Sequence, residues 1–213
     1  MKQTLWRPQL LKPGVFGASL IPLAVLVWQA VTDNLGANPI KEITEQTGLW
    51  TLRFVLITLT ITPARRLTGW NKLIQLRRML GLFAFFYGGL HFLTYVWLDQ
   101  FFVVQEIMAD VVTRPFITVG FLSFVLLIPL AVTSTTAMIK CLGGRWWQRL
   151  HRLVYGIAVG GVVHYLWLVK ADVRSPLMYG GLVALLLGYR VWVARRRRPH
   201  PVYTPRRHVT LRT

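Results

Sequence analysis

The chain has 213 residues, of which 54% are hydrophobic, with nine tryptophans and a mean hydropathy of +0.47, so its apolar surface exceeds what one soluble core of this length can bury and a soluble domain is excluded. The net charge of +18 does not indicate a nucleic-acid partner, because Lys and Arg stand in short clusters between apolar runs and not on one soluble face. The single cysteine, Cys141, excludes an internal disulfide and any thiolate-rich metal or iron–sulfur site.

The N-terminal part predicts a basic leader, residues 1–13, followed by a first membrane helix over the apolar run 14–31. No small-residue cleavage pattern follows this run, so it resembles a signal peptide only superficially and is interpreted as a retained helix. Pro22 near its middle should bend the helix, as membrane helices tolerate. The polar stretch 32–48 is expected to form a loop with room for a short interfacial helix.

Five further apolar runs predict an all-α bundle of six transmembrane helices. The second run is short, carries Arg53 near its start and is expected to end at Pro63. His91 lies in the third run, and His151 and His164 lie in the fifth. The expected spans after the first are residues 49–63, 79–98, 116–133, 144–170 and 177–194, which gives a membrane domain over 14–194 and a basic tail over 195–213.

The loop charges predict the orientation of the bundle. An even number of crossings puts both termini on one side. The leader, the second and fourth connections and the tail hold most of the Lys and Arg residues, so this side is the cytoplasm. All seven acidic residues fall in the opposite loops: Asp33, Glu42, Glu45, Asp99, Glu106, Asp110 and Asp172. That outer face is suited to a partner outside the membrane.

Histidines at two depths predict a haem-binding protein. At about 1.5 Å per residue, His91 lies about 18 Å into its span, past the middle of a roughly 30 Å core, and His164 has a comparable outer depth. Imidazole is a common iron ligand, so this pair could hold one haem, with His151 near the cytoplasmic boundary marking a second station. Intramembrane ionisable residues usually mark functional sites, although purely structural histidines are the alternative.

Glycines beside the outer histidines could give a flat macrocycle room. Gly88 and Gly89 precede His91 and Gly160 and Gly161 precede His164, each pair within one turn. The alternative is a small-residue contact between helices, which applies equally to Gly156 and Gly160, four positions apart.

The inner station lacks a second histidine. Arg77 lies near the same helical face as His91 and occupies the place of the expected ligand. Arginine keeps its proton, so Arg77 and its neighbour Arg78 are candidate ligands or, more reasonably, partners of a haem propionate. The other candidate ligands near the inner station are sulfur-containing side chains, those of Met79, Met138 and Cys141. His151 and His164 are about 220° apart around an ideal helix, so the fifth helix must tilt, bend or rewind to serve both stations.

The chain resembles the MsrQ (YedZ) family of haem-binding membrane subunits, within the ferric reductase-like transmembrane superfamily. The resemblance runs from the first helix to the sixth and is carried by GANPIKEITEQTG, RRMLGLFAFFYGGLHFLTY, TRPFITVGF, TSTTAM and GRWWQRLHRLVYGIAVGGVVHYLW. It implies a b-type cytochrome of the bacterial inner membrane that passes electrons to MsrP, a periplasmic molybdenum-containing subunit that reduces methionine sulfoxide in oxidised proteins. It also implies iron ligation by His91, His151 and His164, and bound FMN, for which the sequence shows no motif.

The chain is expected to conduct electrons and not to be the catalytic subunit. It shows no G-x-G-x-x-G after a strand, so quinol or a separate cytoplasmic flavin reductase should supply the electrons. The basic tail is expected to contact anionic lipid. The alternatives are a stand-alone ferric reductase-like protein and a proton relay or transporter that uses the same histidines, although the spans hold almost no acidic partner for a relay.

Overall fold

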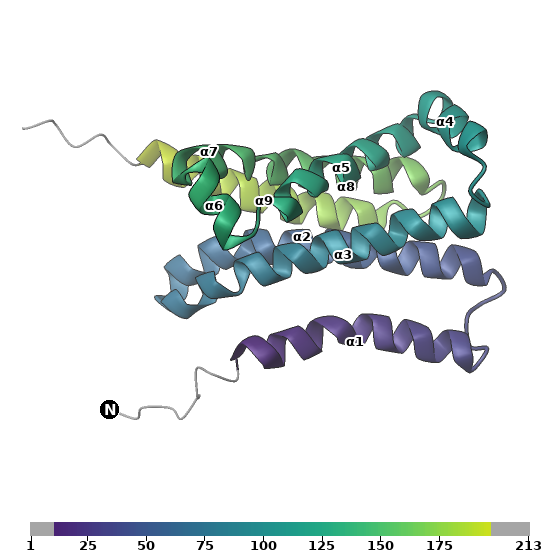
Figure 1. Ribbon diagram of the computed structural model, residues 1–213, viewed down its shortest axis with the longest axis horizontal. Coiled ribbons are helices and arrows are strands. Elements are labelled where there is room, and N and C mark those ends of the chain that lie inside the picture. The colour runs from purple at the N-terminus through teal and green to yellow at the C-terminus, as the bar shows by residue number, and fades with distance from the viewer. Residues whose placement is uncertain (1–10, 197–213) are drawn as a thin grey trace, which may run out of the picture.

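The computed structural model describes residues 11–196, and every regular element in this range is helical. The long helices run along a common direction, with α2 and α3 at the centre, α5, α8 and α9 on one side and α1 on the other (Figure 1). The elements are α1 (Leu11–Val31), α2 (Pro39–Thr68), η1 (Asn71–Gln75), α3 (Arg77–Thr94), η2 (Tyr95–Asp99), α4 (Val104–Thr113), α5 (Pro115–Val132), α6 (Thr136–Leu142), α7 (Gly144–Leu150), α8 (Leu153–Leu168) and α9 (Arg174–Arg196). The prediction of an all-α protein is therefore confirmed for the described residues.

Five segments are long and apolar enough to cross a membrane: α1, α2, α3 with η2, α5 and α9. They coincide with five of the six predicted spans, so the chain is a multi-pass membrane protein. The remaining helix, α8, has 16 residues. Most of the basic leader and tail, residues 1–10 and 197–213, lies outside the described residues, and α1 begins at Leu11, inside the predicted leader.

Helix α2 is longer than the sequence suggested at its N-terminal end. Its first turn is stabilised by the Asn38 side chain, which accepts a 3.1 Å hydrogen bond from the Lys41 backbone amide, and by Pro39 at the first helical position. The prediction of a loop over residues 32–48 was therefore wrong beyond residue 38, because these two residues start a helix that continues into the span.

The prediction that this span ends at Pro63 was also wrong. Helix α2 continues to Thr68 and ends where Gly69 adopts φ +71°, a left-handed conformation that glycine allows at no steric cost. Pro63 has no amide hydrogen for the Leu59 carbonyl four residues earlier. Arg190 of α9 supplies the missing donor, because its Nη2 lies 2.8 Å from the Leu59 oxygen. A side chain from another helix thus replaces the lost backbone bond.

Tyr87 joins α1 to the centre of the bundle. Its ring stacks on Phe54 of α2 at a centroid distance of 5.3 Å. Its hydroxyl donates to the Ser19 carbonyl at 2.9 Å and accepts from the Leu23 amide at 3.1 Å. These two backbone groups are four residues apart, so the hydroxyl is inserted into the hydrogen-bond ladder of α1 beside Pro22.

The predicted fifth span is broken at His151 and Arg152, between α7 and α8. This break confirms that the segment cannot run as one ideal helix past both of its histidines. The acidic connection between α3 and α5 contains α4, where the buried Asp110 carboxylate accepts from Tyr95 and Gln100 and pairs with Arg114 at 3.0 Å. In Figure 1, α4 lies at one end of the bundle and α6 and α7 lie at the other.

Candidate functional site

His91 of α3 is held by a backbone carbonyl of α2. Its Nδ1 lies 2.8 Å from the Thr44 oxygen. A carbonyl only accepts hydrogen bonds, so Nδ1 carries the proton and Nε2 keeps its lone pair. Metal-binding histidines are commonly oriented in this way, with one ring nitrogen donating to a carbonyl while the other faces the metal.

His164 of α8 is held in the same manner by α5. Its Nδ1 lies 2.7 Å from the Phe116 oxygen, so its Nε2 also keeps the lone pair. The helix pairs α2–α3 and α5–α8 therefore each present one imidazole in the tautomer that can bind a metal.

The structure brings these two imidazoles together. Their ring centroids are 6.0 Å apart and their planes are inclined by 74°. Two imidazoles that bind one metal ion from opposite sides, with bonds of about 2 Å, have ring centroids about 6 Å apart. No cluster of three or more His, Cys, Asp or Glu side chains occurs within residues 11–196. The geometry fits a haem iron with two axial histidines.

Two glycines that sequence reasoning missed make room for these rings. A Cβ atom on Gly48 would lie 3.0 Å from His91 Nδ1, and one on Gly120 would lie 2.7 Å from His164 Nδ1. Each glycine stands four residues after the carbonyl that holds the ring, so Thr44 with Gly48 and Phe116 with Gly120 form the same arrangement on α2 and α5. The two glycines could be recognised only from the packing, because each acts together with a carbonyl one turn earlier on a helix that neighbours the histidine.

The four glycines expected to clear a haem have different surroundings. A Cβ on Gly88 would contact Thr51 of α2 and Leu127 and Phe124 of α5, at 3.4 to 3.6 Å. Similar atoms on Gly160 and Gly161 would meet Ser123 and Leu52. Only Gly89 has nothing within 4 Å and so faces open space, whereas the other three make close helix contacts. The clearance role stays a prediction.

A second candidate site lies toward the opposite end of the bundle. A cavity of about 240 Å³ is enclosed by α2, α3, α5, α7, α8 and neighbouring turns. His151, Arg77 and Arg78 all line it, so the structure brings together the three residues that the sequence assigned to an inner haem. The other lining residues are Val55, Thr58, Leu59, Ile74, Gly81, Ala84, Leu127, Leu130, Ala131, Ser134, Trp147 and Val154, and none of Met79, Met138 and Cys141 is among them.

His151 is fixed by Trp147, one turn earlier. The two rings stack at a centroid distance of 3.9 Å, and His151 Nδ1 lies 3.1 Å from the Trp147 carbonyl oxygen. Trp147 in turn donates from its indole Nε1 to the Thr133 carbonyl at 3.0 Å. The remaining imidazole nitrogen, Nε2 of His151, is buried and has no hydrogen-bond partner among the described residues. An orphaned buried lone pair beside a cavity fits an iron ligand.

The two arginines differ in position. Arg77 is half-buried at the start of α3, whereas Arg78 is exposed and its Nη1 lies 3.3 Å from the Thr136 hydroxyl of α6. Arg77 is therefore the better placed of the two to meet a charged group inside the cavity.

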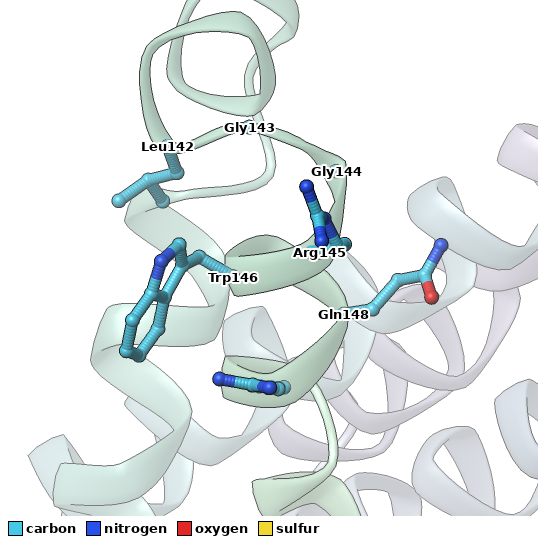
Figure 2. Close-up of a pocket in the computed structure, with 7 residues that line it drawn as sticks. Leu142, Gly143, Gly144, Arg145, Trp146 and Gln148 are labelled. Carbon is cyan, nitrogen blue, oxygen red and sulfur yellow. The ribbon is translucent and has the colours of Figure 1, made fainter.

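A separate pocket of about 650 Å³ lies at the connection between α6 and α7. Figure 2 shows Leu142 and Trp146 on one side of it and Arg145 and Gln148 on the other. The remaining lining residues are Gly143, Gly144 and Arg149. With no histidine, cysteine or carboxylate in its lining, this pocket is not an iron site.

Comparison with known proteins identifies the family of the chain. Residues 47–162 match the family model of the ferric reductase like transmembrane component, a segment that includes His91 and His151. A protein-methionine-sulfoxide reductase heme-binding subunit MsrQ from Herminiimonas arsenicoxydans is 58% identical over 191 residues, which covers 89% of this chain and 88% of that protein. Proteins of the same description from Azospira oryzae and Xanthomonas campestris are 52% and 49% identical, covering 85% and 92% of this chain and 78% and 95% of their own lengths. The chain therefore belongs to the MsrQ family of ferric reductase-like transmembrane proteins.

Proposed function

We propose that this protein is the b-type cytochrome subunit of a methionine sulfoxide reductase system. In this proposal it carries electrons across the bacterial inner membrane, from the quinone pool or a cytoplasmic flavin reductase, to the periplasmic catalytic subunit MsrP, and so supports repair of oxidised proteins. The described relatives are named as heme-binding subunits of such a reductase, which supports the assignment.

The observation that carries the proposal is the pairing of His91 and His164. Both rings donate from Nδ1 to a carbonyl, both keep Nε2 free, and their centroids are 6.0 Å apart. A haem bound there would supply one-electron transfer at its iron. The protein's own contribution is to fix the tautomer and orientation of each ligand and to keep the site dry between four helices.

His151 is proposed as the ligand of a second, inner haem, with Arg77 near a propionate. Its buried Nε2 and the adjoining cavity support this assignment. FMN stays an expectation of the family resemblance, and we assign it no residue.

The bundle is proposed to cross the membrane six times, with both termini in the cytoplasm. Helix α8 would provide the sixth crossing, since its 16 residues rise about 24 Å and α7 extends the segment toward the cytoplasm. The acidic connections at the opposite end would then face MsrP.

An absorption spectrum of the purified protein tests the proposal. A Soret band that sharpens with α and β bands on reduction is expected, whereas a proton relay or transporter would show none. His91→Ala and His164→Ala should each remove the same haem, and His151→Ala should remove a different one. Haem content unchanged in all three variants would exclude these ligands.

Reduction of purified MsrP by the reduced protein separates the reductase subunit from a stand-alone ferric reductase-like protein.

A further inference from the structure

The inner end of the bundle contains half-buried arginines, Arg77 and Arg190, without a carboxylate to balance them. All seven acidic residues of the chain belong to the connections or helix ends at the opposite end. The ion pairs among the described residues also lie there: Lys41 with Glu45, Arg114 with Asp110 and Arg174 with Asp172. Removing a cation from water costs free energy unless an anion accompanies it, so a bound anion would stabilise these half-buried arginines.

Arg190 of α9 is the most firmly placed of these cations. Its Nη2 donates to the Leu59 carbonyl, which Pro63 leaves without a backbone donor, and its Nη1 donates to the Tyr155 hydroxyl at 3.1 Å. Its Cζ lies 5.2 Å from the centre of the Tyr155 ring. Its Nε is buried and makes no hydrogen bond within the described residues. The guanidinium is thus held rigidly and keeps an unused donor.

Arg190 adjoins the cavity that contains His151. Leu59, whose carbonyl it binds, lines that cavity, and Tyr155 directly follows the lining residue Val154. Arg77 lines the cavity from α3 and lies within electrostatic range of both Arg190 and Tyr155. Arg77 and His151 thus line the cavity, and Arg190, with Tyr155 bonded to it, holds the backbone of the lining residue Leu59.

The Tyr155 hydroxyl can complete a carboxylate site. Its oxygen accepts from Arg190, so its own hydrogen remains available to donate. Charge-assisted hydrogen bonds from arginine to a carboxylate are among the strongest in proteins, and they gain from a fixed guanidinium geometry.

We infer that Arg190, Arg77 and Tyr155 form a binding site for the propionate carboxylates of a haem whose iron is held by His151. The inference rests on the proposed function and adds Arg190 and Tyr155 as positioning residues. The phosphate of a lipid headgroup is the other anion that the same chemistry would bind, and the experiment separates the two.

The experiment measures haem binding to the inner site alone. The full-length protein carrying His91→Ala, which lacks the outer site, is produced in haem-deficient cells, placed in nanodiscs and titrated with haem. Arg190→Gln should weaken binding about tenfold, because it removes a charge-assisted contact. It should also lower the midpoint potential of the inner haem, since a nearby cation favours the reduced iron. Arg190→Lys keeps the positive charge but loses the planar guanidinium. Its haem affinity and midpoint potential should therefore lie between those of the parent protein and Arg190→Gln.

Arg53→Gln is the matched control. Arg53 also lies in a membrane helix, donates to the Tyr179 hydroxyl at 2.9 Å and stacks on the Trp50 ring. Neither of these partners lines the cavity, whereas Leu59, the backbone partner of Arg190, does. Haem affinity and potential should stay as in the parent protein. An equal effect of Arg53→Gln and Arg190→Gln would overturn the inference.

A second titration uses haem dimethyl ester, which lacks the carboxylates. The ester should bind the parent protein about tenfold more weakly than haem, and Arg190→Gln should weaken it no further. Equal binding of haem and ester would overturn the inference, and loss of phosphatidylglycerol from Arg190→Gln in native mass spectra would then assign the arginine to lipid. No binding of either compound, in the parent or in the protein with His91 restored, would instead refute the proposed function.

Discussion

At the scale of single residues, each outer imidazole depends on two groups of a neighbouring helix. One is a carbonyl that receives the Nδ1 proton and the other is a glycine four residues later that leaves room for the ring. The two arrangements, Thr44 with Gly48 and Phe116 with Gly120, match although they lie on different helices. The orientation of the two imidazoles thus depends on backbone carbonyls and glycines that do not themselves bind the metal.

Gly120→Ala and Gly48→Ala are expected to reduce binding of the outer haem. The added Cβ would lie 2.7 Å and 3.0 Å from the respective Nδ1, so the ring must move away from the carbonyl that orients it. Loss of such supporting contacts typically lowers metal affinity about tenfold or more. The measurement is haem per protein with the reduced spectrum, and Gly181→Ala, where nothing lies within 4 Å, is the control. Full haem content in Gly120→Ala would contradict the prediction.

At the scale of helices, side chains from other helices bond backbone groups close to two of the prolines inside the spans. Beside Pro22 the Tyr87 hydroxyl enters the hydrogen-bond ladder of α1, and opposite Pro63 the Arg190 guanidinium occupies a carbonyl of α2. The two contacts have different consequences, because Tyr87 attaches a peripheral helix and Arg190 lies beside a candidate ligand site.

Tyr87→Phe should loosen the attachment of α1 while leaving the histidine sites in place. The variant loses two hydrogen bonds of a buried hydroxyl, which corresponds to about 1 to 3 kcal/mol of unfolding free energy. Thermal unfolding in detergent measures the effect, and Tyr189→Phe, whose hydroxyl makes no hydrogen bond within the described residues, is the control. A midpoint equal to that of the unaltered protein would show that the inserted hydroxyl adds nothing to stability.

Pro63→Ala should strengthen α2 and weaken the inner site. Alanine restores an amide hydrogen that can bond the Leu59 carbonyl and compete with Arg190 for it. Haem retention by the His91→Ala protein should fall without a loss of thermal stability. Pro129→Ala in α5 is the matched control, because no arginine bonds the corresponding carbonyl, that of Val125, among the described residues. Unchanged haem retention in Pro63→Ala would contradict the expected competition.

At the scale of the whole molecule, charge divides the bundle into two ends. Helix α4 lies at one end of the bundle, and α6 and α7 lie at the other (Figure 1). The acidic residues belong to connections and helix ends on the α4 side, and the cavity of His151 is lined in part by α7. This division supports a cytoplasmic inner end, because Lys and Arg are retained on that side during insertion.

Reporter fusions test this orientation. A fluorescent protein fused after Thr213 should be fluorescent, and alkaline phosphatase fused there should be inactive, since the tail is expected in the cytoplasm. The same phosphatase inserted at Asn34, between α1 and α2, should be active. Active phosphatase at Thr213 would reverse the proposed topology.

The sequence by itself determined the membrane class, the helical fold and the identity of the deep histidines. Long apolar runs and their flanking charges are local properties, so they can be recognised in the sequence without knowing how the helices pack. Helix α2 extends beyond the predicted span at both ends, at its N-terminus through the cap at Asn38 and at its C-terminus past the tolerated Pro63. Asn38 needs only its own helix, whereas Pro63 needs Arg190, which lies far along the chain.

Only the tertiary structure decided which groups meet. The 6.0 Å approach of His91 and His164 results from the packing of four helices, and so do the carbonyls and glycines that orient the two rings. The same holds for the cavity of His151 and for Arg190, which the sequence placed in an unremarked position of the last span. Such contacts join residues distant in sequence, and the pattern of apolar and polar residues along one helix carries no information about the side chains of another.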